Sequence, residues 1–317
     1  MRTPFNMIIV MAILVMACGA DRDKNGRPLD TPTTGYIKIA ADESLRPLIE
    51  TELTTFEGIY TKADIDCQFV SEADAVDALL KDSVRLAIVT RRFTAQEKKY
   101  FEDIKITPTE VDVAISGVAI ILNSANADTL INLDEIRSLL QGKITSWDGL
   151  GAKSKAGIEI VFDNPNSGMI RYLKDSVARV AKLPANCFAA DNNEAVVDFV
   201  SKNANALGFI GLEWISDKDD SVSNSFLKKV QVAGVSVAKD SAHYQPYQAY
   251  IALKKYPLSR RVTILSREAR AGLGNGFIAF FASERGQRIV LKSGLVPVTM
   301  PLRIVKINTE PLEIEKN

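Results

Sequence analysis

The sequence contains very little of the chemistry on which most enzymes depend. It has one histidine, His243, in the loop-like stretch SAHYQPY, and three cysteines, none of them in a CxxC pair. It contains no nucleophile-elbow sequence, no HExxH and no phosphate loop of the GxxxxGK type. A carboxylate cluster with metal-ligand spacing is also missing. The sequence therefore predicts a protein that is not an enzyme and that uses no metal and no cofactor.

An excess of charge of either sign is missing too, because 39 basic residues are balanced by 39 acidic residues. Nucleic acid is bound largely through a basic surplus that releases counterions. We therefore expect no nucleic-acid partner, and any anion that binds must be held by local groups.

Long apolar runs are absent except at the start, where Arg2 precedes MIIVMAILVM at residues 7–16. This run is too short to span a bilayer as a permanent helix and is typical of a signal peptide, here residues 1–17. The phrase VMAC at residues 15–18 resembles a bacterial lipobox, in which the chain is cut before Cys18 and its thiol then carries a lipid. An ordinary signal or an uncleaved anchor is the alternative, and both would place the chain outside the cytoplasm.

The 300 residues that remain exceed what a single core usually supports, so two lobes are expected. Residues 18–34 are polar, contain Pro, Gly and Asn, and predict a flexible tether. The fold is expected to start at about Gly35. Cys67 and Cys187 could form a disulfide in an oxidising compartment, but we expect them in different lobes.

Strands and helices alternate along the chain, which predicts an α/β fold with a mainly parallel sheet. Two longer segments, 111–123 and 249–265, could each cross from one lobe to the other, and residues 217–225 are expected to form a solvated loop. The expected strands are 36–40, 65–70, 86–89, 158–162 and 206–211, and the expected helices are 47–60, 73–80, 95–101, 132–141, 167–180, 194–200, 276–282 and 284–291.

A hydroxyl residue follows a predicted strand and precedes a helix four times: Ser44, Ser71, Thr90 and Ser167. Each of them alone could simply cap a helix. Several helix N-termini that converge on one cleft would also form an anion site without net basic charge. The pair Ser167-Gly168 favours this hypothesis, with Arg171 one turn on along the same face. A solvated helix arginine is the alternative for Arg171.

The phrase LLQGKITSWDGLG at residues 139–151 resembles the signature of the phosphate-binding proteins of ABC transporters, which have the type 2 periplasmic-binding fold. Further phrases in the order typical of that family are NSG (166–168), ALGFIG (206–211), YPLSRRV (256–262), FIAFFASERGQRIV (277–290) and GLVPV (294–298). Gly142 is expected to end a helix in a left-handed conformation, and Trp147 to fill the core.

This resemblance implies a two-lobed clamp with a two-strand hinge. Lobe 1 would comprise residues 35–117 and 250–305, lobe 2 residues 118–249, and a tail residues 306–317. Together with the pattern of strand ends and helix starts, the resemblance predicts a phosphate site at Ser44, Leu45, Ser71, Thr90, Arg91, Asp163, Ser167, Gly168, Met169 and Arg171.

Three positions depart from the pattern of the family. Met169 replaces a threonine, Arg91 stands where an aspartate is common, and Asp163 stands where an arginine is common, as if the acidic acceptor and the basic donor had exchanged lobes. Asp163 could accept a hydrogen bond from protonated phosphate while Arg91 grips the remaining oxygens. Alternatively, Asp163 only caps its own loop and Arg91 is a solvated loop residue.

The resemblance implies a lipid-anchored, monomeric receptor on the periplasmic or cell-surface side of a bacterial membrane. It would bind inorganic phosphate and deliver it to the permease subunits of an ABC importer. Two alternatives remain: a receptor of the same fold for another oxyanion or small anionic solute, and a non-transport lipoprotein that uses the clamp for sensing or interaction.

Overall fold

The computed structural model describes residues 26–127, 129–217 and 219–300. The predicted signal peptide, Cys18 and the tail 306–317 lie outside these residues, as does most of the predicted tether. Within the described ranges, no helix is both long and apolar enough to cross a membrane.

Strands and helices alternate, as the sequence predicts. The strands are β1 (Thr34–Asp42), β2 (Lys62–Val70), β3 (Leu86–Val89), β4 (Thr109–Asn123), β5 (Leu130–Asn132), β6 (Glu159–Phe162), β7 (Cys187–Ala189), β8 (Ala206–Gly211), β9 (Val230–Val232), β10 (Gly234–Ser236), β11 (Ser259–Ser266) and β12 (Val296–Pro297). The helices are α2 (Arg46–Ile59), α3 (Glu72–Leu80), α4 (Ala95–Asp103), α5 (Leu133–Leu140), α6 (Gly168–Arg171), α7 (Asn193–Lys202), α8 (Ser221–Lys229), α9 (Gln248–Ala252), α10 (Leu273–Ala282) and α11 (Glu284–Lys292).

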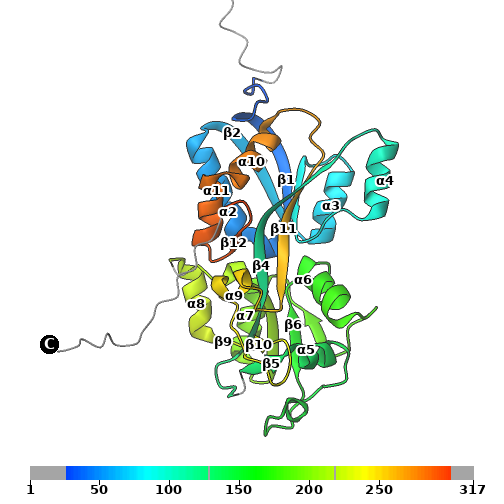
Figure 1. Ribbon diagram of the computed structural model, residues 1–317, viewed down its shortest axis with the longest axis vertical. Coiled ribbons are helices and arrows are strands. Elements are labelled where there is room, and N and C mark those ends of the chain that lie inside the picture. Colours follow the sequence, from blue (N-terminus) through cyan, green and yellow to red (C-terminus); the bar gives the residue numbers. More distant parts are fainter. Residues whose placement is uncertain (1–25, 128, 218, 301–317) are drawn as a thin grey trace, which may run out of the picture.

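The long strand β4 joins two halves of one sheet, whose strand order is β2-β1-β3-β11-β4-β8-β6-β7. Its first part pairs with β11, and from Val118 onward it pairs with β8 and then with β9. The first half contains parallel β1, β2 and β3, and the second half contains parallel β6, β7 and β8. Figure 1 shows β4 running between the two bodies of helices and strands. The predicted α/β fold class is confirmed.

Two predicted segments contain helices that the sequence did not indicate. Residues 249–265, the possible second crossing, contain α9 and a turn before β11, which begins at Ser259. Residues 217–225 are not all loop, because α8 begins at Ser221. The Asp220 side chain accepts a hydrogen bond from the backbone N–H of Ser223, and this cap starts the helix despite its polar composition.

Other local predictions hold. Gly142 follows α5 with φ at 72°, and Trp147 is buried. Cys67 and Cys187 are both free, and they lie in β2 and β7, at opposite ends of the sheet.

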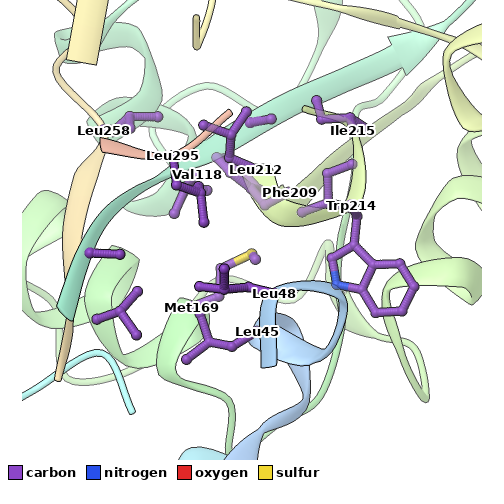
Figure 2. Close-up of a cluster of buried hydrophobic side chains, with 14 of the residues drawn as sticks. Leu45, Leu48, Val118, Met169, Phe209, Leu212, Trp214, Ile215, Leu258 and Leu295 are labelled. Carbon is purple, nitrogen blue, oxygen red and sulfur yellow. The ribbon is translucent and has the colours of Figure 1, made fainter. Parts of the chain in front are cut away.

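The apolar core is continuous across the two halves. Figure 2 shows Leu45 and Leu48 from the first half close to Met169, Phe209 and Trp214 from the second. The halves therefore touch through apolar side chains as well as through the polar strand ends described below.

A carboxyl group is buried in α2 without any partner. Glu52 is fully buried, and neither of its oxygens has a hydrogen-bond partner. Burial raises its pKa to about 9, so the folded protein keeps Glu52 protonated at neutral pH. Between pH 4.5 and 9 the unfolded chain has released this proton and the folded chain has not, so stability falls as pH rises.

We expect Glu52→Gln to flatten this part of the pH dependence and to stabilise the protein at pH 8 by about 1–3 kcal/mol. The control is Glu50→Gln, an exposed carboxylate on the same helix. Urea unfolding at several pH values checks the prediction. Parallel stability curves for Glu52→Gln and wild type from pH 5 to 9 would contradict it.

Candidate functional site

The carboxyl ends of four strands meet where the two halves touch, because parallel strands end at the same edge of a sheet. The first half contributes the residues that follow β1, β2 and β3. The second half contributes the loop between β6 and α6. The polar residues at this edge include Asp42, Ser44, Glu72 and Thr90 from the first half and Asp163, Ser167, Gly168 and Arg171 from the second.

Glu72 is the most heavily hydrogen-bonded carboxylate at this edge, and it is only 2% exposed. Its Oε2 accepts hydrogen bonds from the backbone N–H of Thr90 at 2.8 Å and from the Thr90 hydroxyl at 2.7 Å. Arg171 donates from Nε to Oε1 and from Nη2 to Oε2, the second at 3.4 Å. Burial alone would raise the pKa of Glu72, but the bonds from Arg171 and Thr90 outweigh it and lower the pKa. Glu72 is therefore ionised.

Asp42, which ends β1, links the two halves directly. Its Oδ1 accepts from the Ser44 N–H at 2.9 Å, and its Oδ2 accepts from the Gly168 N–H at 3.0 Å. Burial raises the pKa of Asp42 to about 7; Arg260 opposes this shift, and Glu72 adds to it. Near neutral pH Asp42 is therefore protonated in part of the molecules. A carboxyl group of the protein itself accepts the hydrogen bond from the Gly168 N–H, at the start of α6.

Asp163 accepts a hydrogen bond from the Ser167 hydroxyl at 2.6 Å, and Ser167 Oγ in turn accepts from the Ile170 N–H. Ser167 is thus an N-cap, as the simpler alternative held. Burial raises the pKa of Asp163, while the bond from Ser167 opposes the shift. Asp163 is 1% exposed and faces the same junction as Asp42.

Arg260 lies beneath this junction in β11, and its side chain is 1% exposed. It donates from Nη2 to the Ser44 hydroxyl at 3.0 Å, and the same atom is 3.9 Å from Glu213 Oε2. Its Nε and Nη1 have no hydrogen-bond partner. The indole N–H of Trp214 donates to the Ser44 carbonyl at 3.0 Å. Arg260 therefore supplies positive charge from below to a junction that contains several buried carboxyl groups.

The structure brings together seven of the ten predicted site residues: Ser44, Thr90, Arg91, Asp163, Ser167, Gly168 and Arg171. Arg91 makes two 2.7 Å bonds to Glu97 in its own half, and its Nε lies 3.8 Å from Glu72 Oε1, so it is not a solvated loop residue. The remaining three are turned to other partners. Ser71 caps α3 and bonds to Asp74. The side chains of Leu45 and Met169 lie in the apolar core (Figure 2). Whether any of the ten binds phosphate stays a prediction.

Sequence reasoning missed Asp42, Glu72 and Arg260. Asp42 stands in the ADES phrase directly after a predicted strand, and Glu72 follows Ser71, so both could have been found by the rule that located the hydroxyls. Arg260 has no such signal, because only the antiparallel pairing of β11 with β4 places it under the junction. Among the described residues, no group of three or more His, Cys, Asp or Glu side chains is arranged to hold a metal ion.

A sheet in two halves with its polar strand ends facing each other is the architecture of a solute-binding clamp. A family model described as PBP superfamily domain matches residues 28–285, and the chain belongs to that family. The phosphate-binding protein PstS of Bacillus subtilis is 22% identical over 302 residues, which cover 92% of this chain and 93% of that protein. PstS of Pseudomonas aeruginosa is 22% identical over 283 residues, 84% of each chain.

Solved structures agree with this assignment of the fold. A putative phosphate ABC transporter substrate-binding protein from Clostridium perfringens, solved with bound phosphate, has a TM-score of 0.71 at 24% identity. It covers 83% of this chain and 100% of that one. An ABC-type phosphate transport receptor from Vibrio cholerae has a TM-score of 0.64 at 21% identity, with 83% and 100% covered. The relatives are named as binding proteins and receptors, and the prediction that the chain is not an enzyme is confirmed.

Gly168 permits the close approach of the two halves. A Cβ atom there would lie 2.5 Å from Asp42 Oδ2, 2.5 Å from Glu72 Oε2 and 2.6 Å from Thr90 Oγ1. We expect Gly168→Ala to separate these groups and to destabilise the protein by about 1–3 kcal/mol. Thermal unfolding and small-angle X-ray scattering check this, and a variant as stable and as compact as wild type would contradict it. The control is Gly58→Ala, because a Cβ at Gly58 meets nothing within 4 Å.

Proposed function

We propose that the chain is the substrate-binding protein of a phosphate ABC importer and that it binds inorganic phosphate between its two halves. The observation that carries this proposal is the convergence of hydrogen-bond donors from both halves on one spot. Thr90 comes from the first half, and Gly168 and Arg171 come from the second. The relatives support the ligand, because two are named as phosphate-binding proteins and one was solved with phosphate.

The proposal includes the two lobes predicted from the sequence. Lobe 1 would comprise residues 35–117 and 250–305, and lobe 2 would comprise residues 118–249. In this proposal, the two halves separate about the β4 and β11 strands, admit phosphate and close on it. A lipid on Cys18 would hold the receptor at the outer face of a bacterial membrane, beside the permease that takes up its ligand. The receptor would act as a monomer.

The buried carboxyl groups suit phosphate better than a fully deprotonated anion. Near neutral pH phosphate still carries a proton that a carboxylate can accept, whereas sulfate carries none. Asp163 and Asp42 are both within the junction and both have raised pKa values. The same carboxyl groups favour a second candidate, a receptor for another small oxyanion or anionic solute that carries hydrogen-bond donors. Calorimetry with phosphate, sulfate, molybdate and small carboxylates separates the two.

We expect Ser167→Ala and Arg171→Ala each to weaken phosphate binding by about 10- to 100-fold while the fold stays intact. A hydrogen bond to a charged group contributes about 1.5–3 kcal/mol, and about 1.4 kcal/mol is tenfold in affinity. Isothermal calorimetry measures the effect. Asn132→Ala is the control, because the Asn132 side chain caps α5 in the same way and bonds to the backbone of Asp134 and Glu135, neither of which is a predicted site residue. Wild-type affinity in both variants would show that the anion site lies elsewhere.

Asp163→Asn tests whether this carboxyl group selects the ligand. The change keeps the shape and removes the negative charge, so phosphate should weaken and sulfate should gain. The measurement is the ratio of the two dissociation constants. Asp148→Asn is the control, because Asp148 is exposed and its side chain bonds to Ser146 in the second half. An unchanged ratio in Asp163→Asn would remove the selector role from this residue.

A further inference from the structure

The hydrogen-bond donors that the proposed function assigns to phosphate already bind a carboxylate of the protein itself, that of Glu72. Glu72 accepts from the Thr90 N–H, the Thr90 hydroxyl and the Arg171 guanidinium. Arg91 Nε lies 3.8 Å from Glu72 Oε1. Thr90, Arg91 and Arg171 are all predicted phosphate ligands. Oxyanions in proteins ordinarily accept hydrogen bonds from backbone N–H groups, hydroxyl groups and arginine guanidinium groups.

Gly168 and the facing carboxyl groups leave no room for an added atom between them. The position of a Cβ on Gly168 would lie 2.5 Å from both Asp42 Oδ2 and Glu72 Oε2. The Gly168 N–H is itself bonded to Asp42. Phosphate can therefore bind the Gly168 N–H and the Arg171 Nε–H only where these carboxyl groups have moved away from them.

Glu72 also connects the two halves of the molecule. It begins α3 in the first half, whereas Arg171 ends α6 in the second. Arg171 donates to the Thr90 carbonyl at 3.2 Å as well, so one arginine side chain bonds two residues of the opposite half. The Glu72 side chain is 2% exposed and the Arg171 side chain 30%, so water screens this pair less than it screens surface pairs.

We propose that Glu72 is an internal occupant of the anion site: its carboxylate holds Thr90 and Arg171 in the closed molecule and competes with phosphate for them. This inference rests on the proposed function and adds the regulation of the same site. Phosphate must displace the Glu72 carboxylate from Arg171 and Thr90 in order to bind them. The measured affinity for phosphate therefore reflects the difference in binding free energy between phosphate and Glu72 at these donors. Asp42 occupies the Gly168 N–H in the same manner.

The competing hypothesis gives Glu72 the opposite effect on the affinity for phosphate. A carboxylate that accepted the proton of bound phosphate would strengthen binding, and its removal would weaken binding. The hydrogen bonds argue against that role, because both oxygens of Glu72 are engaged by donors of the protein. The two hypotheses therefore separate on one substitution.

The test is Glu72→Gln, which keeps the shape of the side chain and removes the charge that holds Arg171. We expect phosphate to bind at least tenfold more tightly than to wild type, and the ligand-free variant to have a larger radius of gyration. Isothermal calorimetry with inorganic phosphate and small-angle X-ray scattering give the two readouts. The control is Asp77→Asn, which removes an exposed carboxylate from the same helix, where it pairs only with Lys81. It should match wild type in both.

Each outcome decides the inference separately from the proposed function. Tighter binding by Glu72→Gln supports the inference, even if wild type binds no measurable phosphate, in which case the proposed function fails. If wild type binds phosphate and Glu72→Gln binds it equally or more weakly, the inference is overturned and the proposed function stands. If neither binds, both fail. Should Glu72→Gln not fold, Glu72→Asp replaces it under the same criteria, because the shorter side chain withdraws its carboxylate from Arg171.

Discussion

The pairing of β4 with strands of both halves is the constraint on which the rest of the structure depends. One strand pairs with β11 over its first part and with β8 and β9 over its second. The two parallel groups of strands are therefore fixed on either side of it. Their carboxyl ends face each other, and the contacts that cross the candidate site follow from this arrangement, including the bond between Gly168 and Asp42, which are 126 residues apart.

Charge at this junction is balanced locally and not by the composition of the chain. The sequence is neutral overall, but at least four carboxyl groups are buried where the halves meet: Asp42, Glu72, Asp163 and Glu213. Arg171 and Arg260 face them from two sides. Burial of unpaired charge is costly, so raised pKa values at Asp42, Asp163 and Glu213 are the expected response. Under the proposed function, such a site would discriminate between ligands by their protons as well as by their charge.

Much of the fold could be predicted from the sequence because its segments are strongly periodic. Strand 86–89 and helix 284–291 carry clear patterns, and the apolar length of 111–123 identified the shared strand. The sequence did not indicate the helix at Ser221–Lys229, because most of its residues are polar. Its buried face consists of Ser223 and Phe226 alone, which is too few residues to give a clear periodic pattern. At the candidate site, strand ends and hydroxyl caps could be located from the sequence. The partners of these residues could not, because hydrogen bonds such as Arg171 to Glu72 depend on the approach of two halves that are distant in sequence.

The hydrogen-bond partners of Arg91 and Asp163, the two charged residues that depart from the family pattern, could not be predicted from the sequence either. Each residue has a partner in its own half, Glu97 and Ser167 respectively. The basic group that does reach across is Arg171, and the basic group that approaches from below is Arg260. Of the two arginines, Arg171 is a predicted site residue, whereas Arg260 was not indicated by the sequence.

The two tryptophans of the chain occupy positions that differ in their relation to the junction. Trp214 lies in the second half, and its indole N–H bonds to the Ser44 carbonyl of the first half. Trp147 is buried among residues of the second half alone, and its indole N–H has no partner. Separation of the halves would expose the first indole to water and leave the second as it is. If the halves separate as proposed, the emission spectrum of the protein would contain one signal that follows the separation and one internal standard, without any added label.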